Sequence, residues 1–208
     1  GMIGSLVLER CLSSSEISKV TLLVRKPLGE KHPKIKEVVM SDLSNYLKVE
    51  DEFKATDIAF FCIGVYTGQV PDDLFKKITV DFPIAFANAL KKGNPQATLC
   101  FLSGAGADRS EKSRVAFARY KGMAENRLSA LGLGGFFSFR PGYIYPVTPR
   151  KEPNLLYRAS RFLYPAIKLL GKNTSIKSTD LAQAMVTVGL EGANKEILEN
   201  RDILDCNN

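Results

Sequence analysis

The sequence predicts an α/β protein built on an open parallel sheet with helices on both faces. Short apolar runs, rich in β-branched and aromatic residues, alternate with longer segments of helical period. Polar, charged or glycine residues follow directly after each apolar run. Such alternation is typical of parallel sheets, because each strand returns through a helix to the same edge. We therefore expect a doubly wound, Rossmann-like sheet within one domain.

The chain begins with an amphipathic helix, in which Ile3, Val7 and Cys11 can share one face. The apolar runs predict strands at residues 19–25, 35–40, 57–63, 98–102 and 136–139. Further helices are predicted at residues 43–53, 74–92, 111–131, 154–170 and 181–190, with Pro83 and Pro165 inside two of them. Residues 196–204 suit a last short strand. No linker or repeat divides the chain, so residues 1–208 are predicted to be one domain with a smaller C-terminal part at 143–208.

Composition excludes several classes of protein. The 208 residues are 45% hydrophobic and 25% charged, which is ordinary for a globular protein. No apolar run is long enough to span a bilayer and no signal peptide is visible, so we expect a cytoplasmic protein with no membrane partner. The four cysteines lack disulfide or metal-ligand spacing, and the single histidine, His32, argues against a metal site or a histidine-based triad.

The net charge of +7 is spread along the chain rather than gathered in one tract. This spread argues against a nucleic-acid partner, and a basic site for a phosphorylated cofactor with a solvated surface is the simpler interpretation.

Ligands of open parallel sheets bind at the carboxyl ends of the strands. The residues that follow the predicted strands are Arg25, Asp42, Gly64, Ser103 and the pair Pro141-Gly142. At the start of the chain, Gly1 and Gly4 open the first helix, where free N–H groups favour an anion and glycine lets the backbone approach a pyrophosphate. An ordinary amphipathic helix with a glycine leader is the alternative. Together these segments predict a dinucleotide site formed by Gly1, Met2, Ile3, Gly4, Arg25, Lys26, Asp42, Leu43, Cys62, Ile63, Gly64, Pro141 and Gly142.

The end of the second strand suggests which dinucleotide binds. An acidic residue there would bind the ribose hydroxyls of NAD, whereas an arginine suits a 2′-phosphate. Arg25 and Lys26 therefore favour NADP over NAD, unless both are simply surface charges. Asp42 is either an adenine-side contact or a helix cap. The backbone of residues 62–64 either lies against the adenosine of the cofactor or belongs to the core.

Five segments resemble the atypical short-chain dehydrogenase/reductases, in particular the NmrA-like, NAD(P)H-binding group that includes the Tat-interacting tumour suppressor. They are Gly1-Met2-Ile3-Gly4, Leu22-Leu23-Val24-Arg25-Lys26, the run from Phe101 to Asp108, Tyr120-Lys121-Gly122-Met123-Ala124-Glu125, and Phe139-Arg140-Pro141-Gly142. The resemblance covers almost the whole chain. Two features depart from it: the family's opening strand and first motif glycine are absent, and Phe117 stands where the family's reductases have a tyrosine.

The resemblance implies catalytic positions for Ser103 and Lys121, with Lys121 also contacting the cofactor. The alternatives are a serine that only satisfies backbone groups at a strand end and a solvated lysine on a helix. In such reductases a phenol protonates the substrate carbonyl, a lysine one turn away lowers the phenol pKa, and a serine orients the carbonyl. Phe117 has no acidic proton, and Tyr120 points about 100° away around the helix. Tyr66 and Tyr143 lie in loops near the strand ends.

Two functions follow as hypotheses. One is an NADP-dependent oxidoreductase with an altered proton donor, acting on a small carbonyl or related substrate. The other is a non-catalytic NADP(H)-binding regulator or redox sensor that acts through a protein partner. Ser103 with Lys121 favours the first and Phe117 favours the second, and a homodimer is compatible with both.

Overall fold

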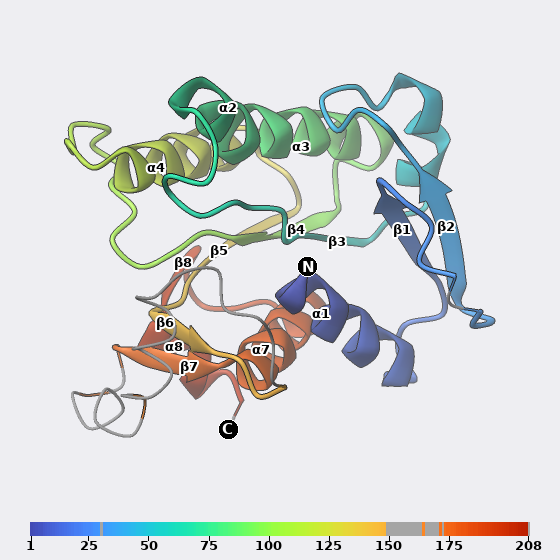
Figure 1. The fold of residues 1–208 in the computed structure, drawn as a ribbon. Coiled ribbons are helices and arrows are strands. Elements are labelled where there is room, and N and C mark those ends of the chain that lie inside the picture. The colour runs from blue at the N-terminus through green and yellow to red at the C-terminus, as the bar shows by residue number, and fades with distance from the viewer. Residues whose placement is uncertain (30, 149–163, 165–170, 172, 208) are drawn as a thin grey trace.

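The computed structural model describes residues 1–29, 31–148, 164, 171 and 173–207. It is a layered α/β fold in which helices cover both faces of parallel strands (Figure 1). The larger sheet has the order β3-β4-β5-β8, with strands Ile58–Phe61, Thr98–Leu102, Gly135–Arg140 and Ile197–Glu199 all parallel. One face is covered by α1 (Met2–Ser13) and α7 (Ser178–Glu191), and the other by α3 (Phe82–Gly93) and α4 (Ala116–Ser129). The doubly wound arrangement expected from the sequence is confirmed.

Strand β4 lies at the centre of both cores. Leu99, Cys100 and Phe101 are fully buried, because alternate side chains point to opposite faces of the sheet. Cys100 joins the core under α1 and α7, whereas Leu99 and Phe101 join the core under α3 and α4. A continuous apolar run such as this one is therefore the correct signal for a strand that is covered on both sides.

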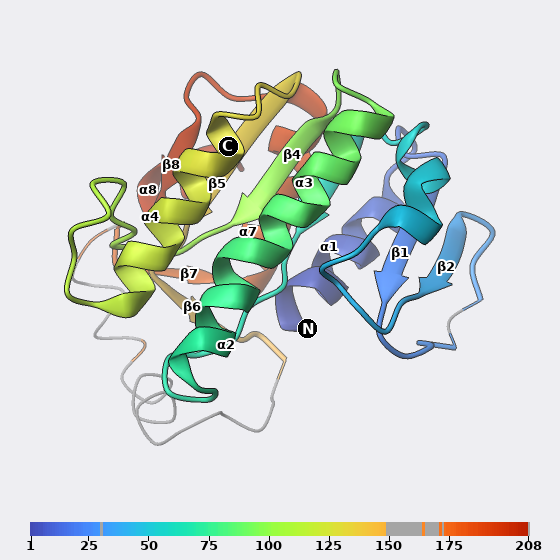
Figure 2. The ribbon, with the colours of Figure 1, turned by 90° about the horizontal axis from the view of Figure 1, so that it is seen from above.

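The sheet is divided rather than continuous. Strands β1 (Val20–Val24) and β2 (Ile35–Val39) pair in parallel as a separate two-stranded sheet beside the β3 edge, as Figures 1 and 2 both show. Among the described strands, β1 pairs only with β2 and β3 pairs only with β4. No described strand lies between β1 and β3 to join the two sheets.

Two predicted helices differ from the structure. The helix expected at 43–53 is a 3₁₀ helix over Leu47–Phe53, because Asp42 and Asn45 accept hydrogen bonds from the backbone N–H groups two residues on and hold the chain in turns. The helix expected at 74–92 consists of α2 (Asp72–Lys76), a π-helical turn (Lys77–Asp81) and α3. Pro83 causes no break, and the helical backbone continues from the π-helical turn through it into α3.

The C-terminal part departs most from expectation. Residues 196–204 form the short strand β8 and then helix α8 (Asn200–Asp205), which a reciprocal pair of bonds between Glu199 and Asp202 caps. Strands β6 (Tyr143–Tyr145) and β7 (Ser175–Lys177), a parallel pair, were not expected. The helix predicted at 154–170 lies outside the described residues apart from Tyr164.

Candidate functional site

Helix α4 presents one stripe of side chains to the carboxyl end of β4. Phe117, Lys121 and Glu125 are spaced four residues apart and therefore share a face. A Cβ atom on Gly104 would lie 2.5 Å from Cζ of Phe117, so the tip of this half-buried ring covers the Gly104 backbone. The Lys121 Nζ donates to the Leu102 carbonyl at 2.8 Å. Successive turns of α4 thus contact residues 102–104 at the carboxyl end of β4, which agrees with the predicted shared face of Phe117 and Lys121.

Lys121 is a buried lysine, with 7% of its surface exposed. Its ammonium lies 4.7 Å from the centre of the Phe101 ring. Burial lowers the pKa of Lys121 from 10.5 to about 8, and the negative charge of Glu125 opposes this by favouring the protonated form. A lysine of this kind is costly to the fold, which is typical of a functional position.

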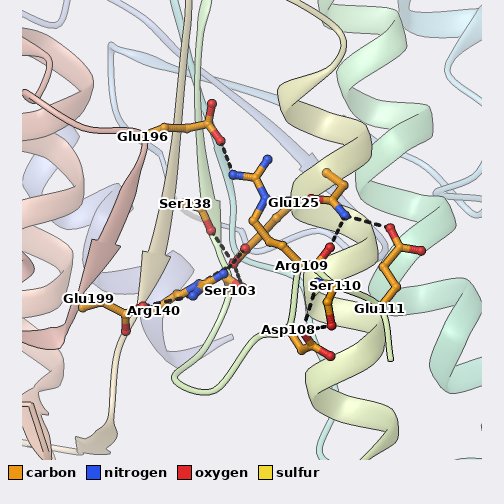
Figure 3. Close-up of polar contacts among 11 residues, drawn as sticks. Ser103, Asp108, Arg109, Ser110, Glu111, Glu125, Ser138, Arg140, Glu196 and Glu199 are labelled. Carbon is orange, nitrogen blue, oxygen red and sulfur yellow. Dashed lines mark hydrogen bonds and ion pairs between the residues drawn. The ribbon is translucent and has the colours of Figure 1, made fainter. Parts of the chain in front are cut away.

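Glu125 is fully buried and gathers four hydrogen bonds (Figure 3). Its Oε1 accepts from Ser103 Oγ at 2.6 Å, from Ser138 Oγ at 2.9 Å and from Arg140 Nε at 3.0 Å. Its Oε2 accepts from Arg140 Nη2 at 2.5 Å. Arg140 also pairs with Glu199 at 3.0 Å. The carboxylate is therefore held by a buried, bidentate ion pair, and Ser103 is bonded to it.

The loop that follows Ser103 is fixed by a second polar cluster, also visible in Figure 3. Asp108 accepts hydrogen bonds from the Ser110 hydroxyl and from the backbone N–H groups of Ser110, Lys112 and Ser113. The bond from the Ser110 hydroxyl is the largest cause of the lowered pKa of Asp108, and the backbone bonds add to it. These bonds hold residues 108–113 in a turn, so α4 begins at Ala116 rather than at residue 111. Arg109 donates to Asn126 on α4 at 2.7 Å and pairs with Glu196 beside β8 at 2.9 Å.

This loop passes very close to α4 at Gly122. A Cβ atom there would lie 1.8 Å from the Asp108 carbonyl oxygen. We expect Gly122→Ala to lower the free energy of unfolding by about 2 kcal/mol or more, because backbone must move to admit the methyl group. Urea unfolding measures this. Gly64→Ala is the matched control, because no atom lies within 4 Å of the added Cβ. An unchanged midpoint for Gly122→Ala would contradict the close approach.

The structure brings together two of the segments predicted to bind a cofactor. A Cβ on Gly4 would lie 3.6 Å from Cβ of Cys62, so the first turn of α1 contacts the chain that leaves β3. Burial raises the pKa of the Cys62 thiol to about 12. Gly1 and Gly64 are exposed, Met2 and Ile63 are half-buried, and Ile3 is buried. Gly4 and Cys62 therefore lie side by side.

Arg25 and Lys26 are exposed directly after β1, and Asp42 is exposed after β2. The Met40 N–H donates to the Val24 carbonyl at 2.8 Å, so the two strand ends remain adjacent. Asp42 accepts from both the side chain and the backbone of Ser44, which lowers the pKa of Asp42. It therefore shapes the turn, and the buried side chain of Leu43 leaves only its backbone for a ligand.

Pro141 and Gly142 follow β5 and lie against the C-terminal part. The Gly142 N–H donates to Asn200 Oδ1 at 2.8 Å, and a Cβ on Gly142 would lie 2.4 Å from the Thr174 carbonyl oxygen. The Pro141 carbonyl accepts from the Ala105 N–H at 2.9 Å. These bonds join the Ser103 turn to the ends of β5 and α8.

Tyr120 takes no part in the Phe117–Lys121 stripe. Its hydroxyl donates to Asp72 at the start of α2 at 2.6 Å, and its ring packs against Phe75. The neighbours that sequence reasoning missed are Glu125 and Arg140. A signal existed for Glu125, which follows Lys121 by four residues, whereas Arg140 was visible only as part of the Arg-Pro-Gly segment.

Neither a metal site nor a membrane-spanning helix is found in the part of the chain that the structure describes. No group of three or more His, Cys, Asp or Glu side chains there is arranged to hold a metal ion. None of the helices there combines the length and the apolar character that crossing a bilayer requires.

Comparison with known proteins shows similarity at the level of structure. No protein-family model matches the chain, and no curated protein sequence matches it significantly. Gre2 from Candida albicans, solved in complex with NADPH, superposes with a TM-score of 0.69 at 14% identity over 95% of this chain and 74% of its own. WbmH from Bordetella bronchiseptica, solved with NAD+, gives 0.69 at 18% identity over 95% and 71%.

A third solved structure, gox2253, superposes with a TM-score of 0.66 at 17% identity. The match covers 95% of this chain but only 66% of that one, so about a third of gox2253 has no counterpart here. At these identities the comparisons show the fold. The chain has the Rossmann-like α/β fold that these structures share.

Proposed function

We propose that this chain binds a nicotinamide dinucleotide at the carboxyl edge of its strands and belongs to the short-chain dehydrogenase/reductase type, in the NmrA-like group that its motifs resemble. The observation that supports this most is the burial of Lys121 beside the Ser103 turn. Burying the charge of this lysine costs the fold more than its one hydrogen bond returns, whereas the dehydrogenases that these motifs resemble use a lysine at this position. The NADPH and NAD+ bound in Gre2 and WbmH agree with such a ligand.

The proposed activity is NADP-dependent oxidoreduction of a small carbonyl compound or the corresponding alcohol. Gly1 to Gly4 and residues 62–64 would contact the dinucleotide, and Lys121 would donate to its ribose hydroxyls. When bound, the cofactor supplies hydride chemistry. This chain's own groups position the substrate through Ser103 and hold a proton at Lys121 Nζ. No phenol occupies the position of Phe117, so turnover is slow.

A second candidate function follows from the same residue. Phe117 cannot act as a general acid, and its ring covers Gly104 where substrate would approach. A regulator that binds NADP(H) without turnover would have no use for a phenol here. Tight binding of NADP(H), with no turnover of small aldehydes, quinones or the matching alcohols, would favour this alternative.

The preference for NADPH over NADH can be tested at Arg25. This side chain is exposed, and it forms no ion pair with any described residue. A guanidinium binds phosphate in bidentate fashion, so NADPH should bind about tenfold or more tightly than NADH. Calorimetry on the protein and on Arg25→Asp measures both affinities, and the substitution should narrow or reverse the gap. Lys19→Asp is the control, because Lys19 is an exposed residue just before β1 and forms no ion pair with any described residue. Equal affinities in the parent protein would remove the NADP preference.

A further inference from the structure

The hydroxyl proton of Ser103 is already committed within the protein. Ser103 Oγ donates to Glu125 Oε1 at 2.6 Å, which is the length of a charge-assisted bond. Glu125 is fully buried, and Arg140 donates to both of its oxygens. An ionised carboxylate has no proton to give and can only accept. Ser103 must therefore be the donor in this bond.

This bond decides what Ser103 can offer a ligand. A serine hydroxyl has one proton and two lone pairs, so with its proton bound to Glu125 it can only accept further hydrogen bonds. Turning the proton outward would break a charge-assisted bond to a buried carboxylate. Ser103 retains 7% of its surface exposed, at the carboxyl end of β4.

The groups around Ser103 complete the pattern. Phe117, against Gly104, offers an apolar ring and no hydrogen bond. Lys121 uses one N–H on the Leu102 carbonyl, and an ammonium has three donors. Lys121 Nζ is thereby held one residue before Ser103, whose Oγ can only accept. An alcohol can donate its proton to Ser103 Oγ, whereas a carbonyl oxygen has no proton to donate and would meet the Ser103 lone pair.

We infer that Glu125, held by Arg140, is a positioning residue that makes Ser103 a hydrogen-bond acceptor, so that the turn after β4 selects an alcohol over the carbonyl compound of the same skeleton. This inference takes one element from the proposed function, namely that a dinucleotide binds beside the alcohol. It concerns binding, and no chemical step depends on it.

The position of the proton can be observed directly. Neutron diffraction from deuterium-exchanged crystals should show the Ser103 deuterium on the line from Oγ to Glu125 Oε1, and Glu125 without a deuterium. A Ser103 deuterium that points away from Glu125, or a protonated Glu125, would overturn the inference whatever the protein binds.

The selectivity is tested with the probe pair 1-phenylethanol and acetophenone by protein-observed NMR titration. The titrations are made without cofactor and in the non-productive pairs, alcohol with NADPH and ketone with NADP+. The parent protein should bind the alcohol about tenfold more tightly, the effect of one well-made hydrogen bond against an opposed lone pair. Equal or weaker binding of the alcohol, including no binding, would overturn the inference.

Three variants separate positioning from packing. Ser103→Ala should abolish the preference. The double variant Glu125→Met/Arg140→Met removes both buried charges together, which folds tolerate better than the loss of one, and frees the Ser103 proton to meet a ketone. Its preference should fall to about unity or reverse. Ser138→Ala is the matched control, because Ser138 donates to the same Glu125 oxygen at 2.9 Å. It should keep the parent preference.

A preference that survives Ser103→Ala would also refute the inference. Failure of the proposed function gives a different result. NADPH and NADP+ would then fail to bind the parent protein, while the alcohol preference without cofactor and its dependence on Ser103 would persist.

Discussion

Phe117→Tyr is expected to raise NADPH-dependent reduction of small aldehydes and quinones by about 10²-fold or more from a low or undetectable base. General acid catalysis by a positioned side chain typically contributes about 10²–10⁴-fold, and the parent protein has no phenol on this stripe. The tip of the Phe117 ring covers Gly104, so an added hydroxyl would lie at the turn that begins with Ser103. Lys121 follows one helical turn later and would lower the pKa of the new phenol.

The assay follows NADPH oxidation over a panel of aldehydes and quinones, and NADP+ reduction by the matching alcohols. Phe117→Leu is the control, because it alters the packing against Gly104 without supplying a proton. Tyr120→Phe should leave the rate unchanged, since the Tyr120 hydroxyl is bonded to Asp72. Brisk turnover by the parent protein would show that another residue supplies the proton. A Phe117→Tyr protein that binds NADPH but stays inactive would favour the non-catalytic regulator.

The order of strands and helices was predictable because each strand is a local apolar run. Residues 98–102 form β4 with the predicted bounds, and the four-residue spacing of Phe117 and Lys121 correctly gave their shared face. The short strands β6 and β7 were missed because three residues in irregular sequence carry no period. The start of α4 was placed five residues early, because side-chain bonds to Asp108 compete with helix formation there.

The site was predictable in part for a different reason. Residues after parallel strands meet at one edge, which explains why Gly4 and Cys62 lie together although they are far apart in the sequence. The Glu125–Arg140 pair depends on the register between α4 and β5, which no local pattern records. The sequence also gave no sign that the serine hydroxyl would be bonded internally, because Ser103, Ser138 and Glu125 come from three separate elements.

Lys121→Met is expected to stabilise the protein near neutral pH while weakening NADPH binding. The pKa of Lys121 is about 8 in the folded chain and 10.5 ordinarily, so burying its charge costs up to ~3 kcal/mol. Loss of the hydrogen bond to the Leu102 carbonyl lowers the free energy of unfolding by about 1 kcal/mol, so the net increase is about 2 kcal/mol at pH 7. Methionine fills the volume of the lysine stem without a charge. Urea unfolding measures the gain, and calorimetry should show NADPH binding at least about tenfold weaker, the effect of one lost charged hydrogen bond.

The pH dependence separates charge burial from other causes of stabilisation. Below pH 8 both the folded and the unfolded chain bind the Lys121 proton, and the full cost is present. Between pH 8 and 10.5 the unfolded chain binds more protons at Lys121 than the folded chain does. The free energy of unfolding of the parent protein therefore rises with pH in this window as far as Lys121 determines it. The advantage of Lys121→Met should therefore be largest at pH 7 and shrink as pH rises through that window. Lys76→Met, at an exposed lysine of α2, should change the free energy of unfolding by less than about 0.5 kcal/mol at every pH. A Lys121→Met advantage that is constant from pH 7 to 10.5 would mean that the ammonium is solvated, and unchanged NADPH binding would remove Lys121 from the cofactor site.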